Sequence, residues 1–171
     1  LINLYGSTEI GGDVTYAIAY SPILNATLGN RIIDGNGKGG SGGSLIGKVF
    51  YGNSCWVVDM DSRCQKEFST VASKNIDDNN KYEPIRQVGQ LLVGGLQVAC
   101  GYYSYVDQNN FILNPVIDGV EQAGRFFLTG DIVSDISGDG DYMWYGRVDN
   151  QVKIRGVRLE LESIELIIAQ K

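Results

Sequence analysis

Residues 142–165 read YMWYGRVDNQVKIRGVRLELESIE, and this stretch decides how the rest of the chain is interpreted. Its first part, Tyr142 to Gly146, has the length of a strand, is rich in aromatic residues and is flanked by turn residues. After Asp149 we predict one more strand. From Leu159 onward apolar residues alternate with glutamates, which predicts a short helix beginning near Glu162. The stretch therefore predicts strands followed by a single C-terminal helix.

Upstream of this stretch, short apolar runs alternate with clusters of Gly, Asn and Asp. The runs Cys55–Asp59 and Gly89–Gly94 also have strand length and turn residues on both sides. Residues 35–44 and 74–81 are polar or glycine-rich and are predicted to be loops. The predicted fold class is α+β and β-rich, a twisted antiparallel sheet or distorted β-barrel with a helix at its end.

Composition excludes several classes of function. The chain has 171 residues, a net charge of -6 and no histidine. An acidic chain lacks the basic face that a nucleic-acid partner needs. Three cysteines without CxxC spacing indicate free thiols in a reducing compartment. No signal peptide or membrane span is visible, but the sequence opens without an initiator Met, so the absence of a targeting signal means little. We therefore expect a cytoplasmic protein without a nucleic-acid or membrane partner.

Two short patterns resemble ligand-binding motifs but lack the required context. Residues 35–40 fit GxGxxG, yet the glycines that follow exclude the helix start that would hold a pyrophosphate. Residues 135–140 resemble the start of an EF-hand loop, but Gly146 stands where a bidentate Glu is required. A glycine-rich loop and a tight turn between strands are the better interpretations.

Residues 3–9, NLYGSTE, combine side chains that suit nucleotide recognition. The amide of Asn3 can pair with a purine edge and the Tyr5 ring can stack on a base, while Gly6 lets a ligand approach the backbone. The hydroxyl of Thr8 can donate to a phosphate, and the carboxylate of Glu9 can bind Mg²⁺. Taken alone, however, a solvent-exposed turn is the better interpretation.

Four segments in a fixed order change this interpretation, because together they resemble the adenylate-forming superfamily. They are NLYGSTE at 3–9, VGQLLVGGLQVACGYY at 88–103, FFLTGD at 126–131 and GRVDNQVKIRGVRLELESIE at 146–165. The last segment is most similar to the amino-acid adenylation domains of non-ribosomal peptide synthetases. Departures from the motifs at Ser7, Gln90 and Leu128 are mild.

The resemblance implies a role for each site residue. It places Tyr5 on the adenine with Asn3, Gly6 and Trp144 nearby. It assigns Thr8 to the α-phosphate, Glu9 to Mg²⁺, Asp131 to the ribose hydroxyls and Arg147 to the ribose and phosphate. It implies that Leu4, Gly12 and Asp13 line the substrate pocket and that Asp149 is a hinge. Tyr5 and Trp144 could instead be core aromatics.

The same resemblance implies the organisation and activity of the parent enzyme. Residues 1–148 would be the C-terminal portion of the large adenylation subdomain, and 149–171 the start of a truncated small C-terminal subdomain. The enzyme would activate an amino acid or another carboxylic acid with ATP and Mg²⁺, releasing pyrophosphate. The acyl group would then pass from AMP to a phosphopantetheine thiol, on a carrier-protein domain or on CoA.

Two alternatives remain open. The first is a fragment of an acyl- or aryl-CoA synthetase. The second is a non-catalytic remnant that binds nucleotide weakly or serves as an interaction module. The phosphate loop and the late lysine of the superfamily are both missing from these 171 residues. We therefore expect the chain to be a fragment that is inactive alone.

Overall fold

The computed structural model describes residues 2–18, 43–60, 66–71, 88–103, 108–136, 140–149, 151–154 and 157–170. The predictions of loops at 35–42 and 74–81 and of a turn at 137–139 lie outside the described residues. The elements in chain order are β1 Ile2–Ser7, the 3₁₀ turn η1 Thr8–Ile10, β2 Gly12–Ile18, β3 Ser44–Val49, β4 Asn53–Val58, β5 Glu67–Phe68, β6 Gly89–Gly95, β7 Phe111–Leu113, β8 Val116–Ile117, β9 Val120–Glu121, β10 Arg125–Asp135, β11 Tyr142–Arg147, β12 Gln151–Ile154, β13 Val157–Glu160 and the helix α2 Leu161–Ala169.

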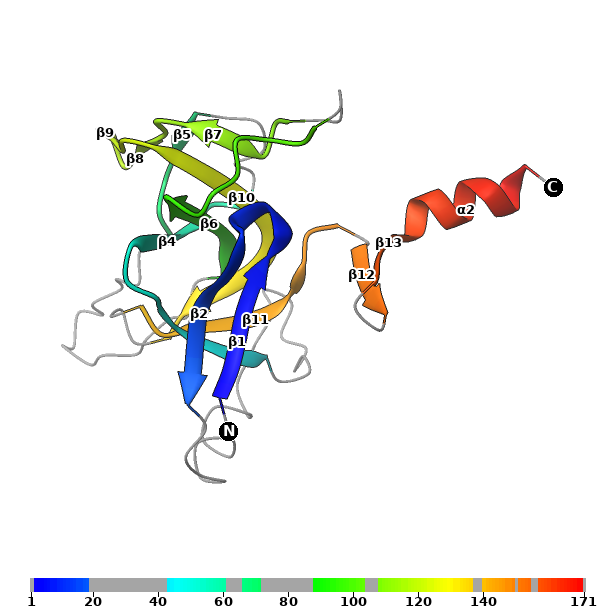
Figure 1. Cartoon of the computed structure of the whole chain (residues 1–171), viewed down its shortest axis with the longest axis horizontal. Coiled ribbons are helices and arrows are strands. Elements are labelled where there is room, and N and C mark those ends of the chain that lie inside the picture. Colours follow the sequence, from blue (N-terminus) through cyan, green and yellow to red (C-terminus); the bar gives the residue numbers. More distant parts are fainter. Residues whose placement is uncertain are drawn as a thin grey trace, which may run out of the picture.

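Most strands belong to one eight-stranded antiparallel sheet (Figure 1). Its order is β1-β2-β3-β11-β10-β6-β4, and β7 also pairs with β10. Strand β10 is the longest, with 11 residues, and pairs with β6, β7 and β11. A smaller sheet has the order β5-β8-β9, in which β5 and β8 are parallel.

Strand β10 carries an irregularity that shapes the site. Residues Phe126 to Leu128 pair regularly with β6, and pairing resumes at Ile132. Between these points β10 advances from Leu128 to Ile132, whereas β6 advances only from Leu92 to Gln90. Residues 129–131 therefore bulge out of the ladder with β6. Gly130 lies in this bulge with φ of 75°, a conformation that glycine adopts without steric cost.

The core lies on both faces of the central strands. Leu91, Val93 and Phe127 belong to one buried apolar cluster, and Leu92 and Phe126 belong to another. Because successive side chains of a strand point to opposite faces, β6 and β10 contribute to the clusters on both faces of the sheet. This explains why residues 91–93, Leu-Leu-Val, form a continuous apolar run rather than an alternating one.

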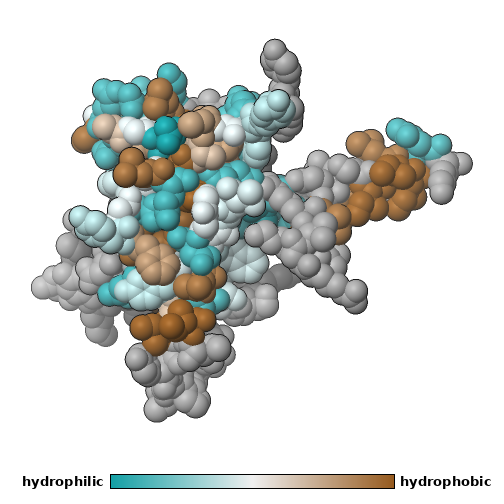
Figure 2. Space-filling view, in the orientation of Figure 1, coloured by the Kyte–Doolittle hydropathy of each residue, from teal (hydrophilic) through white to brown (hydrophobic). Residues whose placement is uncertain are grey.

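The C-terminal elements lie away from this core (Figure 1). Strands β12 and β13 pair only with each other among the described strands, and no residue beyond 149 whose burial is described belongs to either core cluster. Helix α2 exposes Leu166, Ile167 and Ile168, and Figure 2 shows its surface as strongly apolar. No helix among the described residues is long and apolar enough to cross a membrane.

The β-rich α+β fold with a C-terminal helix is confirmed, and α2 begins one residue before the predicted Glu162. One expectation is wrong: the segment after Asp149 holds two strands before the helix rather than one. Both strands have four residues and are separated by only two, so the sequence reads as one run. The division of the chain at residue 148 remains a prediction.

Candidate functional site

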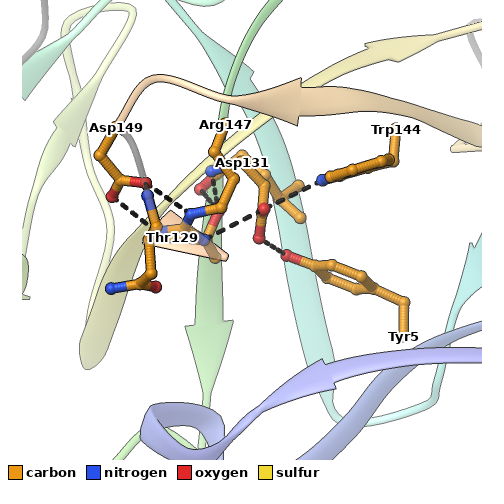
Figure 3. A network of polar contacts seen from close by, with 8 residues as sticks. Tyr5, Thr129, Asp131, Trp144, Arg147 and Asp149 are labelled. Atoms are coloured by element: carbon orange, nitrogen blue, oxygen red, sulfur yellow. Dashed lines mark hydrogen bonds and ion pairs between the residues drawn. The ribbon is translucent and has the colours of Figure 1, made fainter. Parts of the chain in front are cut away.

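The site is built around the carboxylate of Asp131, which is 7% exposed at the β10 bulge. Tyr5 donates its hydroxyl hydrogen to Oδ2. Trp144 donates through Nε1 to Oδ1 at 3.0 Å, and Arg147 donates through Nη1 to the same oxygen at 3.1 Å. Figure 3 shows these three side chains converging on the carboxylate from different directions.

Strand pairing explains why these donors meet. In the pairing of β10 with β11, Asp131 faces Arg147. The register shifts between Ile132 and Val133, and beyond the shift Val133 faces Trp144. Trp144 and Arg147 are three residues apart, so in a regular strand their side chains would point to opposite faces. The register shift allows both side chains to reach the same carboxylate.

Thr129 holds the bulge that presents Asp131. Its hydroxyl donates to the carbonyl oxygen of Leu91 at 3.0 Å and accepts the backbone N–H of Asp131 at 3.0 Å. A regular β6–β10 ladder would satisfy such backbone groups without help. Thr129 was not among the predicted site residues, although its place beside Gly130 and Asp131 in the sequence was a usable signal.

Arg147 also forms a two-pronged contact with Asp149. Its Nε lies 2.7 Å from Oδ1 and its Nη2 lies 2.8 Å from Oδ2, the bidentate geometry of a strong arginine–carboxylate pair. Burial alone would lower the pKa of Arg147, but the hydrogen bonds and negative charges of Asp149 and Asp131 outweigh it and raise the pKa above its usual value. Arg147 is therefore a permanent cation at the site.

The phenol of Tyr5 remains protonated at ordinary pH. Burial raises the pKa of Tyr5 well above its usual value, and the adjacent Asp131 charge raises it further. A neutral phenol can keep donating to the carboxylate. In this arrangement the hydroxyl of Tyr5 is engaged by Asp131, and stacking of its ring on a base remains a prediction.

A second polar group forms around Glu9 in η1. Glu9 is 4% exposed, and Tyr102 donates its hydroxyl hydrogen to Oε1 at 2.7 Å. Thr8, at the start of the same turn, is exposed to solvent. The sequence indicated Glu9 but not Tyr102.

The residues around Glu9 are compatible with a Mg²⁺ ion that takes most of its ligands from water and phosphate. No three His, Cys, Asp or Glu side chains that could hold a metal ion gather within the described part of the chain. Mg²⁺ is commonly bound through one or two carboxylates together with waters and ligand phosphates. A single buried carboxylate such as Glu9 fits that mode and does not fit a cage made by the protein alone.

The remaining predicted residues lie elsewhere on the β1–β2 hairpin. The amide of Asn3 donates to the carbonyl oxygen of Leu45 at 2.7 Å. Leu4, Gly12 and Asp13 are exposed. A Cβ at Gly6 would lie 1.9 Å from the carbonyl oxygen of Gly12, so the hairpin itself requires glycine there. The roles predicted for these residues toward a ligand remain predictions.

The arrangement can bind a ligand that carries hydroxyl donors. An ionised carboxylate has about four acceptor positions, and the described residues donate to Asp131 three times. One further hydroxyl can therefore be accepted beside the guanidinium of Arg147, whose charge is balanced by Asp131 and Asp149.

Comparison with known proteins identifies the family. No family model matches the chain. Vanchrobactin synthetase VabF of Vibrio anguillarum is 33% identical over 166 residues, which cover 96% of this chain and 5% of that protein. The beta-alanyl-bioamine nonribosomal peptide synthetase ebony of Drosophila melanogaster is 31% identical over 172 residues, covering 99% of this chain and 16% of ebony.

A solved structure agrees with these relatives. The Vibrio cholerae adenylation domain AlmE, in complex with glycyl-adenosine-5'-phosphate, matches with 26% identity and a TM-score of 0.57. The match covers 99% of this chain and 25% of that one, so the chain spans a minor part of each relative. The chain belongs to the adenylate-forming superfamily and resembles, within it, the adenylation domains of non-ribosomal peptide synthetases.

Proposed function

We propose that the protein containing this chain activates an amino acid by adenylation, forming an aminoacyl-AMP and pyrophosphate from ATP. The substrate carboxylate attacks the α-phosphorus of ATP, a P–O bond forms, and the bond to pyrophosphate breaks. The four motifs in order and the relatives among peptide synthetases support this activity. The glycyl-adenosine-5'-phosphate bound by AlmE is a product of this class.

The observation that carries the proposal is the carboxylate of Asp131 with its three donors. A buried carboxylate held from three sides cannot rotate freely, so it offers its remaining acceptor position in a defined direction. A ribose presents hydroxyl donors to such a group. In the proposed complex a ribose hydroxyl binds Asp131, and Arg147 neutralises charge near the phosphate.

The turn η1 would hold the reacting end of the nucleotide. Thr8 is exposed and its hydroxyl can donate to an α-phosphate oxygen. Glu9 would hold Mg²⁺, which neutralises phosphate charge when it is bound. No described residue needs to act as a general base, because the attacking carboxylate is already ionised at neutral pH.

We further propose that the acyl group passes to a phosphopantetheine thiol on a carrier protein. The thiol sulfur forms a thioester with the acyl carbon, and AMP leaves. The peptide synthetases among the relatives favour a carrier protein over free CoA. An acyl- or aryl-CoA synthetase remains the second candidate. The cytoplasmic location also remains a prediction.

The test uses the complete protein that contains this chain. Amino-acid-dependent exchange of labelled pyrophosphate into ATP should appear with at least one amino acid, and the Asp131→Ala variant should lose it. Transfer of the labelled acyl group to carrier protein or to CoA then separates the two acceptors. Failure of a full panel of amino and aryl acids to support exchange would favour the non-catalytic remnant instead.

A further inference from the structure

The turn that carries Glu9 is held by a segment some 90 residues further along the chain. The carbonyl oxygen of Glu9 accepts the N–H of Ala99 at 2.9 Å. A Cβ at Gly11 would lie 3.1 Å from the carbonyl oxygen of Gln97, so the two backbones pack closely. The hydroxyl of Tyr102 makes the third contact, at 2.7 Å from the Glu9 carboxylate. The backbone and the side chain of Glu9 are therefore held by the same segment.

The ring of Tyr102 is itself held in place. It meets Phe111 edge-on, with ring centroids 5.2 Å apart and an interplanar angle of 82°. Gln108 accepts the N–H of Tyr102 at 2.9 Å and donates to its carbonyl oxygen at 3.2 Å. Tyr102, Gln108 and Phe111 also line an open pocket of about 340 Å³. Because ring and backbone are both restrained, the hydroxyl has a defined position.

We propose that Tyr102 is a positioning residue that sets the orientation of the Glu9 carboxylate for Mg²⁺. Groups that hydrogen-bond a metal-binding side chain commonly fix its orientation and tune its affinity for the ion. The glutamate side chain has three torsions, and fixing them costs rotamer entropy. When a hydrogen bond fixes them in advance, this cost is not charged against the binding of the ion. The inference rests on the proposed function and extends it to a residue outside the nucleotide contacts.

The neighbouring Tyr103 provides a matched control. Tyr103 is fully exposed and belongs to the same segment, whereas Tyr102 is 36% exposed and reaches Glu9. Tyr102→Phe removes the hydroxyl and retains the ring that packs on Phe111. Tyr103→Phe removes a hydroxyl from the same residue type, one position away, without touching the turn.

The experiment measures binding of Mn²⁺, a paramagnetic substitute for Mg²⁺, by electron paramagnetic resonance. The complete protein is saturated with a non-hydrolysable ATP analogue, and free Mn²⁺ is titrated. Loss of one hydrogen bond to a charged carboxylate should weaken Mn²⁺ binding by about tenfold in Tyr102→Phe. Tyr103→Phe should bind Mn²⁺ like the wild type, and binding of AMP without metal should be unchanged in both variants.

A double-mutant cycle with Glu9→Gln separates the possible failures. If Tyr102 acts through Glu9, Tyr102→Phe should have no further effect on Mn²⁺ binding in the Glu9→Gln background. If Glu9→Gln weakens Mn²⁺ binding and Tyr102→Phe leaves it unchanged, the positioning role is wrong while the proposed function stands. If Glu9→Gln itself has no effect, the metal assignment fails and the positioning role fails with it. A loss of AMP affinity in Tyr102→Phe as large as the loss of Mn²⁺ affinity would show a structural role only.

Discussion

The hydroxyl of Tyr5 on β1 donates to the carboxylate of Asp131 on β10, 126 residues further along the chain. In the sheet order, β2, β3 and β11 separate these two strands. Four inter-strand spacings would place β1 and β10 about 19 Å apart in a flat sheet, well beyond the reach of a tyrosine. The sheet must therefore curl strongly, as in a distorted barrel. This curvature brings the motif at residues 3–9 into contact with the motif at residues 126–131.

Asp131→Ala should cripple adenylation by the complete protein, chiefly by weakening its use of ATP. The substitution removes the acceptor that we assign to the ribose and leaves the donors of Tyr5, Trp144 and Arg147 without their partner. Each hydrogen bond to a charged acceptor contributes about 1.5–3 kcal/mol, so kcat/KM for ATP should fall at least about tenfold. Unchanged kinetics for ATP would remove Asp131 from the nucleotide site.

Gly130→Ala should weaken AMP binding through Arg147. A Cβ at Gly130 would lie 3.0 Å from Nη2 of Arg147, and the residue has φ of 75°. Gly119 has a similar φ of 79° but no atom within 4 Å of a Cβ, so Gly119→Ala is the matched control. Each substitution should cost about 1–2 kcal/mol for the left-handed backbone and lower the midpoint of thermal unfolding similarly. Isothermal titration should show weaker AMP binding for Gly130→Ala alone, and equal affinities would exclude the contact with Arg147.

Cys55 should resist alkylation in the folded protein. Burial raises the pKa of its thiol from 9.0 to about 12, and only the thiolate reacts. The raised pKa lowers the thiolate fraction, and with it the rate at neutral pH, by at least about a hundredfold relative to an ordinary thiol. The rate should rise about tenfold per pH unit between pH 7 and 9, while Cys55 in urea should react like an ordinary thiol. Mass spectrometry after iodoacetamide treatment measures this. Cys55 is partly buried against the core, and rapid native labelling would contradict the raised pKa of its thiol.

The 171-residue polypeptide by itself should not catalyse amino-acid-dependent exchange of pyrophosphate into ATP. The residues proposed to hold ribose and metal are present, but the phosphate loop and the late lysine of the superfamily are not in this sequence. Positioning and charge neutralisation supply most of the catalysis of phosphoryl chemistry, so loss of these two parts should remove it. Exchange above that of a heat-denatured sample, free of contaminating synthetases, would disprove the expectation.

The sequence predicts the strands and the C-terminal helix because apolar runs bounded by glycine are local signals. It misses the β12–β13 hairpin because its two strands are short and closely spaced. The bulge at residues 129–131 is also hidden, since a register shift depends on the partner strand β6. Only Gly130, a residue suited to positive φ, marks the bulge in the sequence.

Some residues of the candidate site could also be predicted from the sequence, and others could not. Asp131, Arg147 and Glu9 could be named from motifs because their residue types and order resemble the family. Thr129 and Tyr102 lie within two of the motif segments, but what they hold could not be predicted, because it depends on partners brought near by the fold. Tyr102 and Glu9 are 93 positions apart, and a tyrosine in an apolar segment is more often a core aromatic. Contacts of this range depend on how distant segments are brought together, which no local pattern encodes.

We predict that Asp149 acts as a hinge in the complete protein, at the junction between β11 and β12. Its Oδ1 accepts the N–H of Gln151 at 3.2 Å as well as Nε of Arg147, so its side chain ties both sides of the junction. The backbone of Asp149 does not have a positive φ, in contrast to Asn114 and Asp118. A hinge residue here would thus change its angles from an ordinary starting conformation.

Two substitutions at Asp149 separate the backbone from the side chain. Asp149→Asn keeps the backbone free and weakens the contact with Arg147, whereas Asp149→Pro also fixes φ near -65°. If a φ change at residue 149 links two orientations, proline should impair one half-reaction and spare the other, and asparagine should affect both only mildly. Adenylate formation and thioester transfer are measured separately by single-turnover kinetics. Wild-type rates in both steps for Asp149→Pro would exclude the hinge, and equal losses in both, with a lowered unfolding midpoint, would instead indicate a structural role.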